Sequence, residues 1–278
     1  MTGVLYIVST PIGNLEDITL RALRILKEVD SILCEDKRVT LKLLNKYNIK
    51  TKLTTYQKFN ENKVLDEVLL ALKTGNNVAL VSDAGTPLIS DPGLLLIRTV
   101  AASDIKIVTV PGPSSLISAV SLCPYSLDEF LFVGFLPQEK NKRIKLIKNL
   151  SSRSKNIVIF IAPHDIKKYT SEIYECYSEA DVFYGRELTK IYEECYSGKI
   201  RDLVLTLEKR SLKGEIVLIL NFESGNSKKK QPSENEFLTK IEKLINSGKS
   251  LKETSKVLAG EYDVSSKYLY DLFLKAKK

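Results

Sequence analysis

The chain has 278 residues, of which 44% are hydrophobic, and it carries a net charge of +8 at pH 7. This length allows two domains and a small appendage, and the charge suits a polyanionic partner without identifying one. The apolar runs are far too short to cross a bilayer, and the N-terminus lacks the pattern of a secretion signal. Four scattered cysteines and a single histidine argue against disulfides and a structural zinc site. We therefore expect a cytoplasmic protein that binds neither a membrane nor a structural metal.

The first part of the chain alternates short apolar, β-branched runs with segments of helical spacing. The expected strands cover residues 4–8, 31–34, 52–56, 78–82 and 106–110. The expected helices cover residues 17–29, 40–46, 92–101 and 114–122, with another that begins after Glu61 and stops at Gly75. Either Asn14 or Asp17 suits the N-cap of the first helix. This alternation predicts a parallel sheet with helices on its faces, in a domain of residues 1–122.

The pattern breaks near residues 123–129, where we place a domain boundary. Beyond it the expected strands cover 131–134, 156–162, 181–184 and 215–220, and the expected helices cover 139–149, 166–177 and a segment around residue 206. The second domain, residues 123–224, is therefore also expected to be an α/β sandwich, with a mixed sheet. The fold class is α/β, with two sandwich domains and a small helical module.

The last fifth of the chain differs in composition. Residues 225–236 are rich in Gly, Ser, Lys, Pro and Asn, which is typical of a linker. Residues 237–278 show three short segments of helical spacing, as in a helix-turn-helix module. From Gly225 onwards the chain has twelve lysines against seven acidic residues, so this module is a candidate for binding a polyanion.

Three small, polar loops each follow an apolar run and lead into a helix. They cover residues 9–14, 82–87 and 111–115. In a parallel sheet such loops meet at the carboxyl edge, where open α/β sheets bind their ligands. Gly and Pro fix the turns, and Ser, Thr and Asp supply directed hydrogen bonds. The loops therefore predict a pocket for a nucleotide-like cofactor.

The chain contains several separated motifs, YIVSTPIGNLED at 6–17, CEDKR at 34–38, VSDAGTPLISDPG at 81–93, VPGPSS at 110–115, GFLP at 134–137, RELTK at 186–190 and KGE at 213–215. These motifs resemble those of the small-subunit ribosomal RNA 2′-O-methyltransferases in the tetrapyrrole methylase superfamily. Residues 237–278 resemble the small C-terminal helical module of that family, which implies that this module binds RNA. The resemblance implies an S-adenosylmethionine-dependent homodimer with the cofactor between two α/β domains. Its implied substrate is the 2′-oxygen of a cytidine in the decoding region of the small ribosomal subunit.

The resemblance implies a cofactor site built mainly from the three loops. The implied cofactor-binding residues are Pro11, Asp83, Gly85, Thr86, Pro87, Ser114, Ser115 and Phe135. Each also has a structural interpretation, since loop residues build turns, Ser114 suits a helix N-cap and Phe135 suits a core.

Methyl transfer to a hydroxyl needs in-line alignment and a group that removes the proton. The candidates for these roles are Glu35, Asp36, Glu187 and Lys190, and the candidates for RNA contact are Arg38, Asn60, Glu61, Arg143 and Arg186. A solvated charged turn is the alternative for residues 36–38. Histidines common in the family are replaced here by Gln57, Phe59 and Tyr192, so His164 is the single histidine candidate.

Two other functions remain open at this point. One is methylation of a tetrapyrrole-type small molecule, against which the basic helical module and the first loop, which lacks a glycine-rich sequence, both argue. The other is a cofactor-sensing RNA-binding or assembly factor without catalysis, which the missing histidines favour. Transfer of a labelled methyl group to ribosomal RNA would separate these three interpretations.

Overall fold

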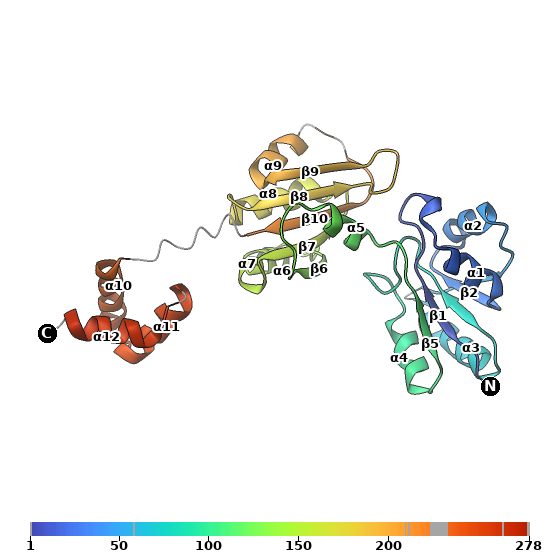
Figure 1. Cartoon of the computed structure of the whole chain (residues 1–278), viewed down its shortest axis with the longest axis horizontal. Helices are drawn as coiled ribbons and strands as arrows, with labels where there is room; N and C mark the ends of the chain where they lie inside the picture. Colours follow the sequence, from blue (N-terminus) through green and yellow to red (C-terminus); the bar gives the residue numbers. More distant parts are fainter. Residues whose placement is uncertain are drawn as a thin grey trace. The chain divides into compact units, whose positions relative to one another are not determined.

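The computed structural model describes residues 2–57, 59–208, 210, 212–222, 233–262 and 264–276 (Figure 1). The chain forms two compact units, Met1–Phe222 and Glu223–Lys278. The described part of the first unit contains two five-stranded sheets, and the described part of the second is helical. None of the helices in the described ranges is long and apolar enough to span a bilayer.

The first sheet is parallel throughout, with strand order β3-β2-β4-β1-β5. Its strands are β1 Leu5–Val8, β2 Ser31–Cys34, β3 Lys52–Thr55, β4 Val78–Leu80 and β5 Ile107–Val110. The helices of this domain are η1 Leu15–Asp17, α1 Leu20–Glu28, α2 Lys37–Lys46, α3 Glu61–Lys73, α4 Leu94–Ala102 and α5 Ser115–Leu122. The predicted parallel sheet is confirmed.

Alternation along β1 divides the core of this domain into two layers. Val8 packs with residues of α1 and α2, whereas Leu5 and Ile7 pack with residues of α3 and α4. This follows from the two-residue period of a strand, which sends successive side chains to opposite faces. Helices on both faces leave the carboxyl edge of the sheet free for loops.

The second sheet has strand order β6-β7-β10-β8-β9 and is mixed, as predicted, because only β6 and β7 run parallel. Its strands are β6 Leu131–Phe135, β7 Asn156–Ile161, β8 Asp181–Arg186, β9 Glu194–Lys199 and β10 Ile216–Asn221. The helices of this domain are α6 Lys140–Ile147, α7 Leu150–Arg153, α8 Ile166–Cys176 and α9 Ile200–Glu208.

The two faces of this sheet have different partners. One face packs on α6, α8 and α9. The other carries Val158, Phe183 and Val217, which pack with Leu116 of α5 and with Ile12 of the first loop. The shared apolar cluster joins the two α/β domains within the first unit.

Two local predictions are wrong. The first helix does not begin at Asp17: Asn14 caps the short turn η1, and α1 begins at Leu20 after Thr19, whose hydroxyl accepts a hydrogen bond from the backbone N–H of Ala22. Strand β9 was not predicted, because it is a partly exposed edge strand without a continuous apolar run. The predicted stop after α3 is confirmed, since Gly75 has a φ of +97°.

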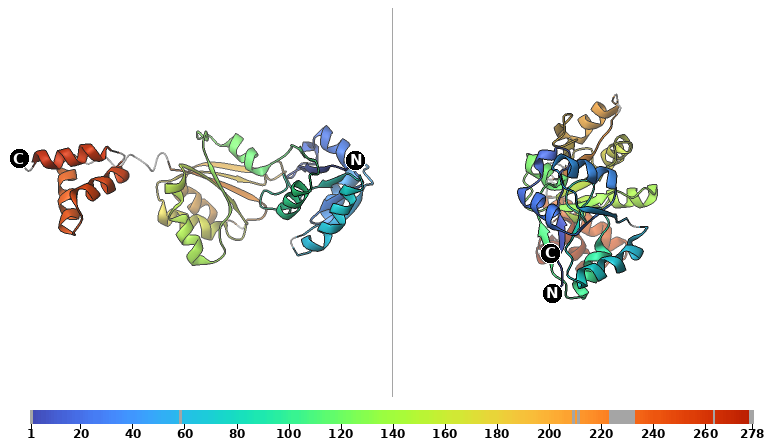
Figure 2. Two further views of the ribbon diagram at one scale, coloured as in Figure 1. Left: turned by 90° about the horizontal axis from the view of Figure 1, so that it is seen from below. Right: turned by 90° about the vertical axis from the view of Figure 1, so that its right-hand side faces the viewer.

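The helical unit contains α10 Glu234–Asn246, α11 Leu251–Tyr262 and α12 Ser266–Ala276 in its described part (Figure 2). Its small core consists of Phe237, Ile241, Leu258, Leu269 and Phe273. The predicted linker extends too far, because α10 begins at Glu234 with Ser233 and Glu236 in a capping box. Residues 223–232, including most of that linker, lie outside the described residues.

Candidate functional site

Backbone hydrogen bonds join the first two of the three loops. The N–H of Thr10 donates to the carbonyl oxygen of Gly85 over 2.9 Å, and the N–H of Gly85 donates back to Thr10 over 3.0 Å. Gly85 has a φ of +81°, a conformation that costs glycine little and other residues more. The Thr10 hydroxyl also donates to the carbonyl of Ser82 over 3.1 Å. The loop after β1 and the loop after β4 therefore form one rigid piece.

The hydroxyl of Thr86 joins the third loop to the other two. It donates to the carbonyl oxygen of Pro113 over 3.1 Å and lies 2.9 Å from the hydroxyl of Ser9. Because Thr86 has one proton and gives it to Pro113, the Ser9 hydroxyl is the donor in the second contact. Ser114 follows directly and caps α5. The three loops thus share one hydrogen-bonded platform at the carboxyl edge of the first sheet.

A cavity of about 430 Å³ lies between this platform and the second sheet. Its volume is within the range of about 300–1,000 Å³ that is typical of small-molecule sites. The second domain contributes Phe135 at the end of β6, Ala162 and Pro163 after β7, and the chain from Gly214 into β10. Among the described residues, no group of three His, Cys, Asp or Glu side chains is placed to hold a metal ion.

The charge of the cavity is one-sided. Four acidic residues line it, and none of the described residues in its wall is basic; the four are Glu35, Asp83, Asp91 and Glu215. Burial, with the nearby carboxylates, raises the pKa of Glu35 to about 7 and that of Asp91 to about 6. Burial also raises the pKa of Asp83. Four carboxyl groups with no basic residue among the described residues of the wall suit the cavity to a cationic ligand.

Most of the expected cofactor-binding residues meet at this cavity. The wall includes Asp83, Gly85, Thr86, Ser114, Ser115 and Phe135. Pro11 and Pro87 are buried and do not belong to the wall, so the structure places them as turn residues behind it. Ala162, Pro163 and Gly214 also line the cavity and were not predicted. Gly214 belongs to the KGE motif at 213–215, which resembles the family's sequence. No role had been predicted for this motif, although it could have indicated a part of the site.

The candidates at the end of β2 separate into two kinds. Glu35 lines the cavity, whereas Asp36 caps α2 through the N–H of Arg38 over 2.8 Å. The Arg38 side chain also bonds to the Asp36 carboxylate, and these contacts lower the pKa of Asp36 to about 2. A carboxylate of so low a pKa is a weak base. The Arg38 side chain remains 88% exposed.

Glu187 and Lys190 lie on one turn of the second domain, beside the cavity wall. Lys190 Nζ lies 2.8 Å from Glu187 Oε1, and the same oxygen accepts the N–H of Glu215 over 3.0 Å. On the same turn, the hydroxyl of Thr189 accepts the N–H of Asn14 from the first loop over 3.1 Å. Glu187 and Lys190 therefore stabilise the backbone at Glu215, which lines the cavity.

The structure contradicts the prediction that Arg143 contacts RNA. Its side chain is 0% exposed and forms an ion pair with Glu172, so it is held inside the second domain, facing away from solvent. The spacing to Ile147, four residues on, places both on the buried face of α6. The exposed lysines of this helix had suggested a uniformly basic surface.

The other RNA candidates also have internal partners. Arg186 is 16% exposed in its side chain and bonds to Glu194 and to the carbonyl of Lys213, both over 3.1 Å. Asn60 accepts the N–H of Gln57 over 2.7 Å, and Glu61 accepts the hydroxyl of Tyr56 over 2.6 Å. Arg38 is the most exposed side chain among the arginines of this set.

Curated proteins similar to this chain share one name. A ribosomal RNA small subunit methyltransferase I from Thermotoga maritima is 45% identical over 219 residues, which are 79% of this chain and 98% of that protein. A protein of the same name from Bacillus subtilis is 36% identical over 276 residues, covering 98% of this chain and 94% of the relative.

Solved structures agree on the fold. A cobalt precorrin-4 methyltransferase has a TM-score of 0.62 at 16% identity, with 79% of this chain and 95% of that chain covered. A uroporphyrin-III C-methyltransferase from Thermus thermophilus, complexed with S-adenosylhomocysteine, has a TM-score of 0.56 at 17% identity, with 79% and 97% covered. The family model of the tetrapyrrole (corrin/porphyrin) methylases matches residues 4–204. The chain therefore belongs to the tetrapyrrole methylase family, and within it to the group of the ribosomal RNA small subunit methyltransferases I.

Proposed function

We propose that this protein transfers a methyl group from S-adenosylmethionine to the 2′-oxygen of a cytidine in the decoding region of small-subunit ribosomal RNA. The observation that carries the proposal is the acid-lined cavity between the loop platform and the second sheet. The names of relatives at 36–45% identity support ribosomal RNA as the substrate. An RNA substrate of this kind also implies that the protein works in the cytoplasm, and the family resemblance supports a homodimer.

The cavity residues fit the cofactor chemically. S-adenosylmethionine has an ammonium and a sulfonium group, and the carboxylates of Asp83 and Asp91 offer the negative charge that both need. Phe135 and Pro163 provide an apolar wall for an adenine ring. Ser115 opens α5, whose first backbone N–H groups suit the carboxylate of an amino acid. When bound, the donor supplies an activated methyl group whose leaving group is a neutral thioether.

Glu35 is the group that we propose as the proton acceptor. It lies in the cavity wall, and a pKa of about 7 leaves it partly ionised at neutral pH and basic enough to accept a proton from a hydroxyl. Asp36, Glu187 and Lys190 are better suited to positioning. Asp36 caps α2, and Glu187 is hydrogen-bonded to Lys190 and to the backbone N–H of Glu215.

The charge of the cavity also limits how RNA approaches. Phosphate groups are repelled by the carboxylates of the wall, so a ribose must enter while its phosphates stay at the rim. Arg38 has an exposed side chain three residues after Glu35 and suits one of those phosphates. We propose that the lysine-rich helical unit supplies further, less specific contacts to RNA.

The two alternative functions are less well supported. The solved tetrapyrrole methyltransferases are 16–17% identical to this chain and inform on its fold alone. The relatives at 36–45% identity are named for ribosomal RNA. A non-catalytic sensor would not need, in its cofactor cavity, a carboxyl group whose pKa is raised to about 7 by partial burial.

The direct test is methyl transfer to ribosomal subunits. With tritiated donor, we expect the wild-type protein to label the small subunit or its RNA at one ribose, which then resists alkaline cleavage. A catalytic base contributes about 10²–10⁴-fold, so Glu35→Gln is expected to reduce the rate by that factor with S-adenosylhomocysteine affinity largely retained. Labelling of a tetrapyrrole precursor instead, or cofactor binding without any transfer, would contradict the proposal.

The raised pKa of Glu35 predicts how stability depends on pH. The folded protein holds this proton more tightly than the unfolded chain, so the group lowers stability as pH rises from about 4.5 to about 7. Glu35→Gln is therefore expected to raise the melting temperature of the ligand-free protein at pH 8 and to leave it unchanged near pH 4.

The matched control is Asp36→Asn, whose effect has the opposite sign. Because its folded pKa is lowered to about 2, Asp36 stabilises the protein above the unfolded value of 3.8 and loses this effect in acid. At pH 8 the Asp36→Asn variant should have a lower melting temperature than the wild type. Equal shifts for Glu35→Gln at both pH values, measured by calorimetry, would show that Glu35 is not buried as described.

Removal of the helical unit tests its role in RNA binding. A chain ending at Phe222 should bind S-adenosylhomocysteine as the full chain does, because the cavity lies wholly in the first unit. Its affinity for small-subunit RNA should fall, and the plot of log Kd against log salt should become flatter as phosphate contacts are lost. An unchanged salt dependence, measured by fluorescence anisotropy, would place the RNA contacts elsewhere.

A further inference from the structure

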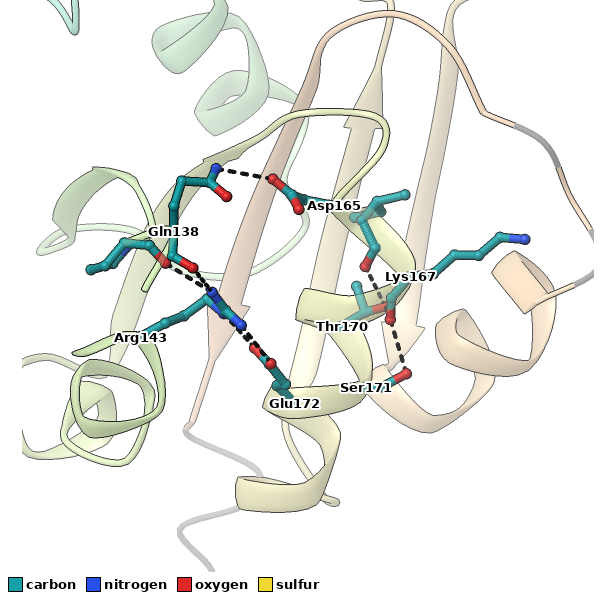
Figure 3. Close-up of polar contacts among 9 residues, drawn as sticks. Gln138, Arg143, Asp165, Lys167, Thr170, Ser171 and Glu172 are labelled. Atoms are coloured by element: carbon teal, nitrogen blue, oxygen red, sulfur yellow. Dashed lines mark hydrogen bonds and ion pairs between the residues drawn. The ribbon is translucent and has the colours of Figure 1, made fainter. Parts of the chain in front are cut away.

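Arg143 is a fully buried arginine in the helical layer of the second domain. It lies on α6, and its Nε and Nη2 donate to the two carboxylate oxygens of Glu172 on α8, over 2.6 and 2.8 Å (Figure 3). Its guanidinium carbon also lies 4.7 Å from the ring centre of Tyr169. The pair is thus bidentate and enclosed, a geometry that lysine cannot reproduce.

The remaining nitrogen of the guanidinium holds the chain that leaves β6. Arg143 Nη1 donates to the carbonyl oxygens of Pro137 and Gln138, over 3.0 and 2.7 Å. This segment comes directly after Phe135 in the cavity wall and Leu136 in the core. One buried side chain therefore ties the position of the β6 end to helix α8.

A second contact extends this tie to the neighbouring strand. Gln138 Nε2 donates to Asp165 Oδ2 over 3.2 Å, and Asp165 stands two residues after Pro163 of the cavity wall (Figure 3). The ends of β6 and β7 are thereby linked through the side chains of Gln138 and Asp165, while Arg143 and Glu172 tie the end of β6 to α8. We call Gln138, Arg143, Asp165 and Glu172 the Arg143 clamp.

Stability alone does not explain a buried ion pair. Removing two charges from water costs about as much as their attraction returns, and an apolar pair of similar size is often as stable. An apolar side chain would, however, leave the carbonyls of Pro137 and Gln138 without their donor. The particular property of this arginine is that it fixes backbone positions next to the cavity.

We propose that the Arg143 clamp is a positioning device for the cofactor cavity, which sets the wall formed by Phe135 at the end of β6 and by Ala162 and Pro163 after β7. Arg143 and Glu172 do not touch the ligand and act through these wall residues. The inference rests on the proposed function in so far as the cavity is the site of S-adenosylmethionine.

The test compares affinity for S-adenosylhomocysteine, by calorimetry on the full chain, among variants that are folded at the temperature of measurement. Arg143→Met removes the donors at similar length and is expected to weaken binding at least about tenfold. Arg143→Lys keeps the positive charge but loses the bidentate geometry of the guanidinium group, and it is expected to weaken binding by about threefold. The matched control is Ile173→Ala, in the same buried core beside Glu172, which should lower the melting temperature but leave the affinity within about twofold.

An affinity of Arg143→Met equal to that of the wild type would overturn the proposal, as would an equal loss in Ile173→Ala. If Arg143→Met does not fold, Gln138→Ala decides, because it breaks the link between the two strand ends and keeps the ion pair. It should weaken binding by about threefold with its melting temperature nearly unchanged; an unchanged affinity would refute the clamp. Absence of binding to the wild-type protein would instead refute the cofactor site itself.

Discussion

The cavity of this protein depends on one set of hydrogen bonds among three loops. The Thr86 hydroxyl contacts Ser9 and Pro113, and the backbone of Thr10 pairs with that of Gly85. Without these bonds each loop would be a separate flexible connection, and a ligand would have to order all three on binding. With them, the loops present Asp83, Thr86 and Ser114 to the cavity as one surface.

In the second domain, arginine side chains fix backbone segments by donating hydrogen bonds to their carbonyl oxygens. Arg143 binds the carbonyls of Pro137 and Gln138, and Arg186 binds that of Lys213. Both segments lead to residues of the cavity wall, Phe135 and Gly214. Two arginines that a basic composition would assign to RNA are thus used to shape the wall, and the exposed positive charge lies elsewhere.

Much of the fold could be predicted because strands and helices differ in the period of their apolar residues. The short apolar run Leu5–Val8 is enough to predict β1. The helical spacing of Ala22 and Ile25 is enough to predict that α1 exists, although not where it begins. Strand β9 could not be predicted in this way, since it is partly exposed at the edge of the sheet. Its pairing with β8 is a property of the folded sheet.

The site was harder to predict than the fold, for a physical reason. The three loops are recognisable by their small residues, but the pKa of Glu35 depends on burial and on Asp83 and Asp91, which lie far along the chain. The partner of Arg143 is likewise 29 residues away. Contacts of this kind exist only after the sheets have assembled, so local patterns contain little information about them.

The central claim is that the Thr86 hydroxyl prepares the cofactor site by joining the loops. The most direct measurement is the calorimetric affinity for S-adenosylhomocysteine of Thr86→Val, which keeps the shape, and of Thr86→Ser, which keeps the hydroxyl. Loss of both hydrogen bonds, at about 1–3 kcal/mol for groups left unpaired, is expected to weaken binding at least about tenfold in the valine variant. The serine variant should remain within about threefold of the wild type. Valine and serine variants that both bind as tightly as the wild type would contradict the account.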